Sequence, residues 1–529
     1  GNLIGQNRGN VDIDTLTQEL RLNANFLNIV DLMVGGFYFD ENVKYTNALT
    51  YGPQFRPYVN LLSGGAVTQL ETLILGVPAG TFQQTGQGIF DNTQMDNRAW
   101  SIFGNLDIKL GDDLTLTVGG NYTKDRKDVV TATVSTDAFS ALDFVTIGSG
   151  VIRNTVIAQQ VGGLLGVSSA TPAQIAGFAA AQPAAYGQIV TGATAFATAN
   201  AANPAVNPLL GLRPLQFLPP FLNIPNAVEN GQSRDGKWTY TARLAWKVTD
   251  TVNTYLSYAT GFKASSFNLS RDSRPLASDL AALRTAGLVL PNLTTGSRYA
   301  GPENAKVFEL GIKANWGIAS ANMTLFKQTI KGFQSNVFTG TGFALANAGK
   351  QSTYGVEFDG MVKPTKELGL NLSLVYLEPK YDSFTASAVG NLSGTRPAGI
   401  PGLSTTMGAQ WNKELANGNR VILRGDWHWE SEVQIAEGLP AFIQRNALGQ
   451  VISYQPAYDA ARAFQREVSE INASLTYAMT NGLELSLWGR NLNNNRYLIQ
   501  IFDSVAQPGS VSAYPNQPRT YGASLRFKW

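Results

Sequence analysis

The sequence predicts an all-β transmembrane antiparallel β-barrel, and three observations lead to this fold class. The chain is a succession of long segments in which apolar and polar residues alternate, which is the period of an extended strand. The connections between these segments are alternately very short and very long. Aromatic residues end several apolar faces beside the short connections. A transmembrane barrel has all three features, because its strands turn one face to lipid and the other to a wet interior.

Seven pairs of alternating segments precede a single terminal one. In residues 368–374 every second residue is leucine, and the residues between are Gly, Asn and Ser. Within each pair the connection is short and rich in Gly, Asn and Asp, which favour tight hairpin turns. Residues 1–12 are too short and too polar to predict a further strand. The expected pairs are 16–24 with 29–45, 99–108 with 114–130, 238–248 with 252–262, 307–316 with 322–333, 354–362 with 368–381, 403–412 with 421–433, and 468–478 with 483–502, followed by 521–529.

The connections between the pairs are long, poorly periodic and rich in Gly, Ala, Pro and Asn: they are residues 46–97, 134–235, 264–304 and 435–465. Loops beyond about 15 residues are uncommon in compact soluble domains. Short turns at one end of the strands and long loops at the other are typical of outer-membrane barrels. The Ala-rich stretch 171–200 inside the second loop predicts local helix.

The terminal segment, TYGASLRFKW, does not by itself distinguish a barrel from a soluble fold. Tyr521, Leu525, Phe527 and Trp529 fall on one face, and the other face carries Gly, Ser, Arg and Lys. Such a strand fits a soluble sandwich as well as a barrel.

Aromatic residues at one common level favour the barrel. Trp246, Trp316, Trp411, Tyr477 and Trp529 all lie on apolar faces where a strand meets a short turn or the chain end. A barrel places such residues in a girdle at one membrane interface, whereas a soluble sandwich gives no reason for the alignment.

The strand count predicts a barrel wall that is incomplete. The pattern gives about fifteen strands, and the first and the last run in the same direction. Neighbouring strands of such a barrel are antiparallel, so these two cannot close the wall.

The amino-acid composition limits the kinds of partner and reaction that the chain can support. Charged residues make up 15% of the chain, below the roughly 25% usual for soluble domains, and the net charge of +2 predicts no nucleic-acid partner. There is no cysteine and one histidine, His428, so we expect no catalytic residues, no metal site and no cofactor. His428 alternates with Arg424, Asp426 and Glu430, which predicts ordinary polar lining of the barrel interior.

Six motifs, met in family order over nearly all of the chain, resemble the C-terminal part of the β-barrel of TonB-dependent outer-membrane receptors. They are Gln18-Glu19-Leu20-Arg21-Leu22 with Gly35-Gly36-Phe37-Tyr38-Phe39; Ser257-Tyr258-Ala259-Thr260-Gly261-Phe262-Lys263 with Phe267-Asn268; Pro302-Glu303 with Phe308-Glu309-Leu310-Gly311-Ile312-Lys313; Asn347-Ala348-Gly349 with Tyr354-Gly355-Val356-Glu357; Gly489-Arg490-Asn491-Leu492 through Arg496-Tyr497; and Pro518-Arg519-Thr520-Tyr521.

The resemblance implies a 22-stranded barrel with short periplasmic turns, long extracellular loops and an N-terminal plug. The first strand here resembles the eighth of that barrel. We therefore expect residues 1–529 to form a partial barrel domain of about 15 of 22 strands, without the plug, the TonB-coupling box and the first seven strands.

The resemblance also implies a function. The chain would belong to a receptor in the outer membrane of a Gram-negative bacterium that imports a scarce nutrient, and the expected nutrient is a ferric siderophore or a similar metal chelate. Expected partners are outer-membrane lipid and lipopolysaccharide, the TonB complex through the absent plug, and the barrel-assembly machinery, which reads Tyr521, Leu525, Phe527 and Trp529. A passive large-pore channel and an all-β surface adhesin remain alternatives.

Arginine and aromatic residues in the long loops are the candidate substrate-binding residues. Arginine pairs with carboxylates through two hydrogen bonds, and aromatic rings offer flat contact area, so both suit anionic chelates or aromatic compounds. The alternative for each residue is packing between loops. The candidates are Arg56, Tyr58, Arg213, Phe217, Phe221, Arg271, Arg274, Arg298, Tyr299, Phe338 and Phe343.

Overall fold

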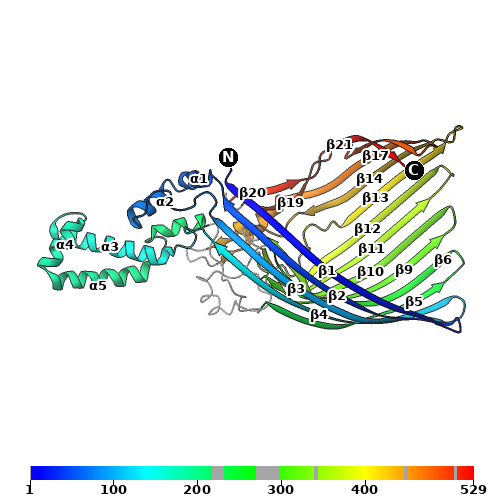
Figure 1. The fold of residues 1–529 in the computed structure, drawn as a ribbon, viewed down its shortest axis with the longest axis horizontal. Coiled ribbons are helices and arrows are strands. Elements are labelled where there is room, and N and C mark those ends of the chain that lie inside the picture. Colours follow the sequence, from blue (N-terminus) through cyan, green and yellow to red (C-terminus); the bar gives the residue numbers. More distant parts are fainter. Residues whose placement is uncertain are drawn as a thin grey trace.

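In the computed structural model, the main element of the fold is one large antiparallel sheet that curls around a hollow (Figure 1). The structure describes residues 2–216, 231–269, 298–338, 343–385, 387–445, 451–504 and 509–528. Within them the sheet has fifteen strands: β1 (Ile4–Phe26), β2 (Val30–Tyr51), β3 (Gly88–Lys109), β4 (Leu114–Ser135), β5 (Gln232–Lys247), β6 (Val252–Lys263), β9 (Glu303–Asn315), β10 (Ala319–Phe338), β11 (Phe343–Val362), β12 (Leu368–Ser383), β13 (Leu403–Glu414), β14 (Arg420–Gln434), β17 (Gln465–Ala478), β18 (Leu483–Arg490) and β21 (Thr520–Phe527).

Each strand of this sheet pairs with its neighbour in chain order, from β1 to β21, and the short turns all lie at one end (Figure 1). The predicted fold class, strand count and alternation of short turns with long loops are confirmed. Over the described residues, β1 and β21 are the two edges and no pairing joins them, as their common direction predicts. The sheet is therefore not closed.

Several predicted boundaries are wrong. β3 begins at Gly88 instead of the predicted residue 99, and β11 begins at Phe343 instead of the predicted residue 354. The first strand begins at Ile4, and the residues that the sequence excludes as too polar pair with β2 as far as Tyr51. The ladder continues past the apolar band, where both faces of a strand are polar and the alternation is lost. The predicted strand 483–502 is broken after Arg490, because Asn491 and Asn494 adopt positive φ angles of 49° and 54°. The chain resumes in β19 (Leu498–Asp503), which pairs with β20 (Val511–Pro515) in a separate hairpin.

The outer face of the sheet is apolar and exposed. Leu244, Leu256 and Leu310 stand side by side on β5, β6 and β9, and each is more than 40% exposed. Near the short turns, Trp246, Trp316 and Trp411 are exposed on this face, which confirms the predicted girdle for these three residues. Tyr477 is half-buried, and Trp529 lies outside the described residues.

A second aromatic girdle lies toward the long loops. Trp100, Tyr122 and Trp238 contact one another across β3, β4 and β5, with ring centroids 5.5 and 5.2 Å apart. Tyr258 and Phe308 continue this level on β6 and β9, 4.7 Å apart. On β5, Trp238 and Trp246 bracket the apolar band and are eight positions apart, roughly 26 Å of strand. Because barrel strands tilt by about 40°, this length spans roughly 20 Å along the membrane normal, slightly less than an apolar band about 25 Å tall.

The long loops carry the helices, which gather at the end of the sheet opposite the short turns (Figure 1). The predicted helix within 171–200 is confirmed as a pair that starts with a capping box at Thr171. None of the helices in the described part of the chain has the length and apolarity to cross a membrane. The helices are α1 (Phe55–Leu62), α2 (Ala66–Gln69), the π-helix η1 (Leu70–Ile74), α3 (Phe144–Leu165), α4 (Pro172–Ala181), α5 (Pro183–Asn200), α7 (Gln455–Arg462) and the 3-10 turns η2 (Pro208–Leu215) and η3 (Pro440–Phe442).

The first two long loops pack on each other and form one cap with its own hydrophobic core. Phe55 and Val59 of α1, Leu70 of η1 and Phe139 and Phe144 of the second loop are all buried in it. Large apolar side chains from both loops are buried there together with Tyr51 of β2 and Ile89 of β3, and this burial stabilises the cap.

Candidate functional site

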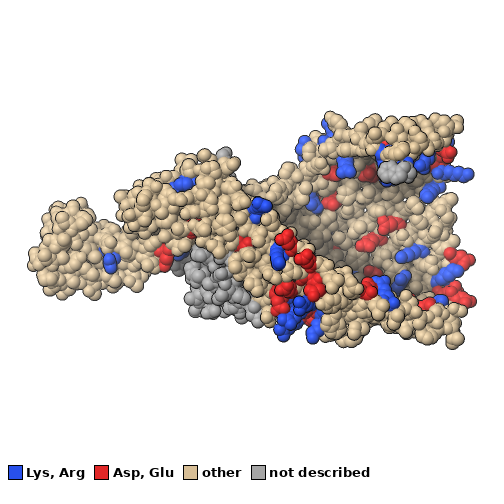
Figure 2. Space-filling view, viewed as in Figure 1, with Lys and Arg blue, Asp and Glu red and all other residues tan. Residues whose placement is uncertain are grey.

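The inner face of the sheet lines a hollow that carries Asp, Glu, Lys and Arg side chains (Figure 2). On β14 the predicted polar face is confirmed. His428 lies 3.0 Å from the hydroxyl of Thr406 and 3.3 Å from the carboxylate of Glu430, and Arg466 donates to Glu430 at 2.9 Å. Asn472 donates to Asp426 at 2.7 Å. Polar side chains on this face therefore form hydrogen bonds and ion pairs with one another, as expected for a wall that faces water.

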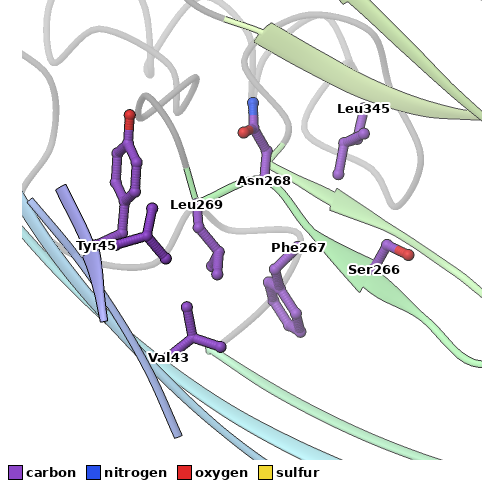
Figure 3. Close-up of a pocket in the computed structure, with 8 residues that line it drawn as sticks. Val43, Tyr45, Ser266, Phe267, Asn268, Leu269 and Leu345 are labelled. Carbon is purple, nitrogen blue, oxygen red and sulfur yellow. The ribbon is translucent and has the colours of Figure 1, made fainter. Parts of the chain in front are cut away.

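A pocket of about 340 Å³ opens on the inner side, at the long-loop end of the sheet (Figure 3). Val43 and Tyr45 of β2 form one wall, and the segment from Ser266 to Leu269 forms the other. Its volume is within the range of small-molecule sites. The residues that line it are Val11, Val43, Tyr45, Ser266, Phe267, Asn268, Leu269 and Leu345.

The lining combines apolar contact with a few polar groups. In Figure 3, Phe267 and Leu269 face Val43, while the hydroxyl of Tyr45 and the amide of Asn268 lie on the other side of this apolar group. Gly9 leaves room for Tyr45, because a Cβ atom there would lie 2.8 Å from the tyrosine hydroxyl. This arrangement suits a ligand with a flat or apolar body and hydrogen-bonding groups.

Two short segments fold inward to make the pocket. β7 (Ser266–Phe267) pairs with β8 (Tyr299–Ala300), and the rings of Phe267 and Tyr299 are 5.3 Å apart. The Tyr299 hydroxyl is 3.1 Å from that of Ser265. The predicted residue Tyr299 thus supports the pocket wall from behind.

Amide side chains of the sheet hold these segments in place. Gln334 of β10 accepts a hydrogen bond from Ser266 at 2.6 Å and donates to the carbonyls of Ala264 and Gly301. Asn347 of β11 accepts from the Gly301 amide at 2.7 Å and donates to its carbonyl at 2.9 Å. Asn347, the first residue of the Asn347-Ala348-Gly349 motif, therefore holds the inward-folded segment in place.

Arg298 and Arg56, both predicted to bind substrate, have partners inside the protein. Arg298 is only 1% exposed and donates to the Thr131 hydroxyl at 2.6 Å. Arg56 donates to Glu71 at 2.6 Å and to Thr68 at 3.2 Å. These contacts give both arginines a structural role.

The other predicted residues are scattered. Tyr58 is half-buried on α1, and Arg213 is exposed in η2, where its charge acts on Asp143. Phe338 and Phe343 pair through their backbones at the loop ends of β10 and β11, and their side chains are outside the description. Phe217, Phe221, Arg271 and Arg274 lie outside the described residues. Binding by these residues stays a prediction.

Sequence reasoning missed most residues of the pocket. Phe267 and Asn268 stand in one of the family motifs and could have been found there, whereas Tyr45 shares its face with Phe37, Phe39 and Val43 and does not stand out. Val43 and Leu345 carry no signal, because apolar residues of a barrel are expected to face lipid. Among the described residues, no group of three or more His, Asp or Glu side chains could hold a metal ion.

Comparison with known proteins agrees with this geometry. The family model described as TonB dependent receptor-like, beta-barrel, matches residues 2–492. The chain belongs to this family. Barrels of TonB-dependent receptors lie in the outer membrane of Gram-negative bacteria, so the apolar band of this barrel chain faces the lipid of that membrane, with short turns in the periplasm and long loops outside the cell. Receptors of this family are transporters rather than enzymes.

Solved receptors share the fold of this TonB-dependent receptor chain at low sequence identity. The ferric yersiniabactin uptake receptor FyuA from Yersinia pestis is 13% identical, with a TM-score of 0.57, over 98% of this chain and 54% of that one. The siderophore receptor PiuA from Acinetobacter baumannii is 12% identical, with a TM-score of 0.54, over 98% and 56%. The copper transporter OprC is 13% identical, with a TM-score of 0.51, over 98% and 57%.

The TonB-dependent receptor chain described here spans about half the length of these solved structures. No curated protein sequence matches it significantly.

Proposed function

We propose that this chain forms part of the barrel wall and the substrate-binding cap of an outer-membrane receptor that imports a scarce nutrient. The proposed substrate is a ferric siderophore or a similar metal chelate, and the import is energised through TonB by a plug domain. Residues 1–529 are proposed to be barrel domain only, with neither the plug nor the coupling box among them. The family supports transport, and solved relatives named for yersiniabactin, siderophore and copper transport favour a metal-related substrate.

The pocket at the top of the hollow is the observation that carries this proposal. It is built by loop segments that fold inward from β6 and β9 against the opposite wall at Val43 and Tyr45. A passive pore needs an open passage at this level, whereas a receptor needs a site that holds its ligand at the entrance. The aromatic ring of Phe267 and the Tyr45 hydroxyl supply contacts suited to the organic part of a chelate.

The test is an uptake assay with the full-length protein in a host that lacks other receptors. Cells receive radioactive iron bound to a catecholate, a hydroxamate or citrate, or radioactive copper, with and without a functional TonB. We expect TonB-dependent accumulation of at least one probe. Tyr45→Ala and Phe267→Ala should each lower it about tenfold, as the loss of roughly 1.4 kcal/mol of contact would do. Tyr514→Ala is the matched control, because this loop aromatic is exposed on β20 and lies outside the pocket.

Three results would contradict the proposal. Accumulation that persists without TonB would favour the passive channel, and absence of accumulation together with cell attachment would favour the adhesin. Uptake that survives both pocket substitutions at normal surface abundance would reject the pocket as the binding site.

A further inference from the structure

A second pocket lies on the inner face of the sheet, deeper than the pocket at Tyr45. It has a volume of about 330 Å³ and is walled by β10, β11 and β12, with Ile400 of the loop after β12 at its edge. β11 reaches both pockets, because Leu345 lines the first, and Gln351, six residues farther toward the periplasmic turn, lines the second. We call the second pocket the wall pocket. Its lining residues are Phe326, Gln328, Ile330, Gln351, Thr353, Glu357, Val375, Leu377, Pro379 and Ile400.

Six of the ten lining residues are apolar, although they belong to an interior wall that carries many polar side chains. Ile330 of β10 and Val375 and Leu377 of β12 are half-buried there. The ring of Phe326 lies over Gly355, where a Cβ atom would overlap with it. An apolar recess of this size suits the organic body of a small ligand.

The polar side chains of the wall pocket are unused by the rest of the described protein. Gln351 is only 8% exposed, and its side-chain oxygen is buried without a hydrogen-bond partner. Gln328, Thr353 and Glu357 form no side-chain hydrogen bond or ion pair within the described part of the chain. Buried polar groups are normally satisfied, so several unused groups that converge on one apolar recess indicate a ligand.

Carboxylates give the wall pocket a negative charge. Glu357 is exposed to the hollow, and Asp359 follows it on the same face of β11. Glu309 lies on the inner face of β9. Serine hydroxyls donate to Asp359 and Glu309 at 2.6 and 3.2 Å, but none of the three carboxylates forms an ion pair with a described residue. Negative charge that the protein leaves uncompensated beside an apolar recess attracts a cation.

We infer that the wall pocket binds an extended organic molecule whose ammonium group lies beside Glu357 and whose polar groups farther along bond to Gln328 and Gln351. Phe326 suits the same ligand, because the face of an aromatic ring attracts a cation. Glu357 pairs in register with Thr324, and Gln328 is four residues farther along β10, so roughly 13 Å of strand separate the carboxylate from the first amide. This second site does not depend on the substrate proposed for the first pocket.

Binding of three probes that differ only in charge to the detergent-purified full-length protein tests the inference. The cationic probe is monoacetylated octane diamine, with an ammonium and an amide at the two ends of its chain. N-octylacetamide is the neutral probe, and the acetylated amino acid of the same length is the anionic probe. Calorimetry, with protein-free micelles as the blank, should show that the cationic probe binds about tenfold more tightly than the neutral probe and that the anionic probe does not bind.

Variants locate the binding in the wall pocket. Glu357→Gln should weaken binding of the cationic probe about tenfold and leave the neutral probe unchanged, because only the cation pairs with the carboxylate. Gln351→Leu should weaken both probes about threefold, since it removes a hydrogen bond to their amide. Val375→Trp fills the pocket and should abolish binding of both. Glu41→Gln is the matched control, because Glu41 lies on the inner face of β2 outside the pocket, and this variant should bind like wild type.

Folding of each variant is verified by its shift on heating in gel electrophoresis. The inference is overturned if no probe binds the wild-type protein, which is the result expected if another part of the full-length chain fills the pocket. Equal binding of the cationic and anionic probes, or of the cationic probe to wild type and Glu357→Gln, would reject the ammonium group as the ligand chemistry. Binding that survives Val375→Trp would lie outside the wall pocket and would equally overturn the inference.

Discussion

At the scale of single residues, Arg56 shows how a buried partner gives a structural role to a side chain that the sequence suggests for ligand binding. Arginine in a long loop suggests a ligand contact, but Glu71 is fully buried beside it and binds it at 2.6 Å. The same carboxylate accepts hydrogen bonds from the backbone amides of Gly80 and Phe82, both at 2.8 Å. A buried charge must be paired, so this ion pair fixes the loop between β2 and β3.

Asp143 gives a prediction about pH. It caps α3 by accepting hydrogen bonds from the amides of Val145 and Thr146, and the Thr146 hydroxyl, ahead of these amides, lowers the pKa of the carboxyl below its usual value. A lowered pKa in the folded state stabilises the helix fully above the unfolded pKa of about 4, and this stabilisation is lost as the pH falls through the folded value.

Asp143→Ala should therefore destabilise α3 by about 1 kcal/mol at neutral pH. Faster hydrogen exchange of amides in α3 would measure the loss. Asp143→Asn should keep the cap and abolish its dependence on acid pH. Equal exchange in wild type and Asp143→Ala would show that tertiary packing alone holds the start of the helix.

At the scale of elements, a run of asparagines replaces strand pairing after β18. Where the chain leaves the ladder, Asn493 accepts from the amide of Ile471 at 3.1 Å and donates to the carbonyl of Ser469 at 2.6 Å. Asn495 accepts from the Ser469 amide, and the Leu492 amide donates to the Ile471 carbonyl. Side-chain amides thus satisfy the backbone of β17 across the break.

Asn493→Ala should leave two backbone groups of β17 without partners. Each unsatisfied group costs about 1–3 kcal/mol, and more in contact with lipid. We expect a lower melting temperature in detergent and less assembled protein in the membrane. Asn412→Ala is the control, since its side-chain oxygen is buried in β13 without a hydrogen-bond partner. An unchanged melting temperature for Asn493→Ala would show that this pairing contributes nothing.

At the scale of the whole molecule, the two faces of the sheet meet different solvents. Leu256 and Ser257 are neighbours on β6, but Leu256 is 58% exposed on the outer face, whereas Ser257 donates to Glu309 on the inner face at 3.2 Å. Leu256→Arg should cost about 2–4 kcal/mol and reduce outer-membrane insertion, because it places a charge near the middle of the apolar band.

Ser257→Arg is the matched variant, and it should be tolerated because a carboxylate faces the new cation. Immunodetection of folded protein in outer-membrane fractions compares the two. Equal insertion of both variants would contradict the assignment of the outer face to lipid.

The strand order and the two faces of the wall could be predicted because they are local. The alternation of apolar and polar residues, the short turns and the aromatic residues beside them are visible within short stretches of sequence. A tight turn brings two consecutive strands together, so they pair with each other. The limits have two causes. Where both faces of a strand are polar, as at the start of β1, the alternation vanishes, and the break at Asn491 depends on contacts with β17, which are not local in sequence.

The pocket and the cap were decided by tertiary structure. Tyr45 and Phe267 are far apart in the chain, and they face one pocket only because the sheet curls and Gln334 and Asn347 hold the loop inward. Arg56 is a structural residue because Glu71 is buried beside it. A sequence shows which side chains are present on each face of a strand. Binding depends on distances across the hollow, and these distances are set by the curvature of the sheet and by the packing of the loops.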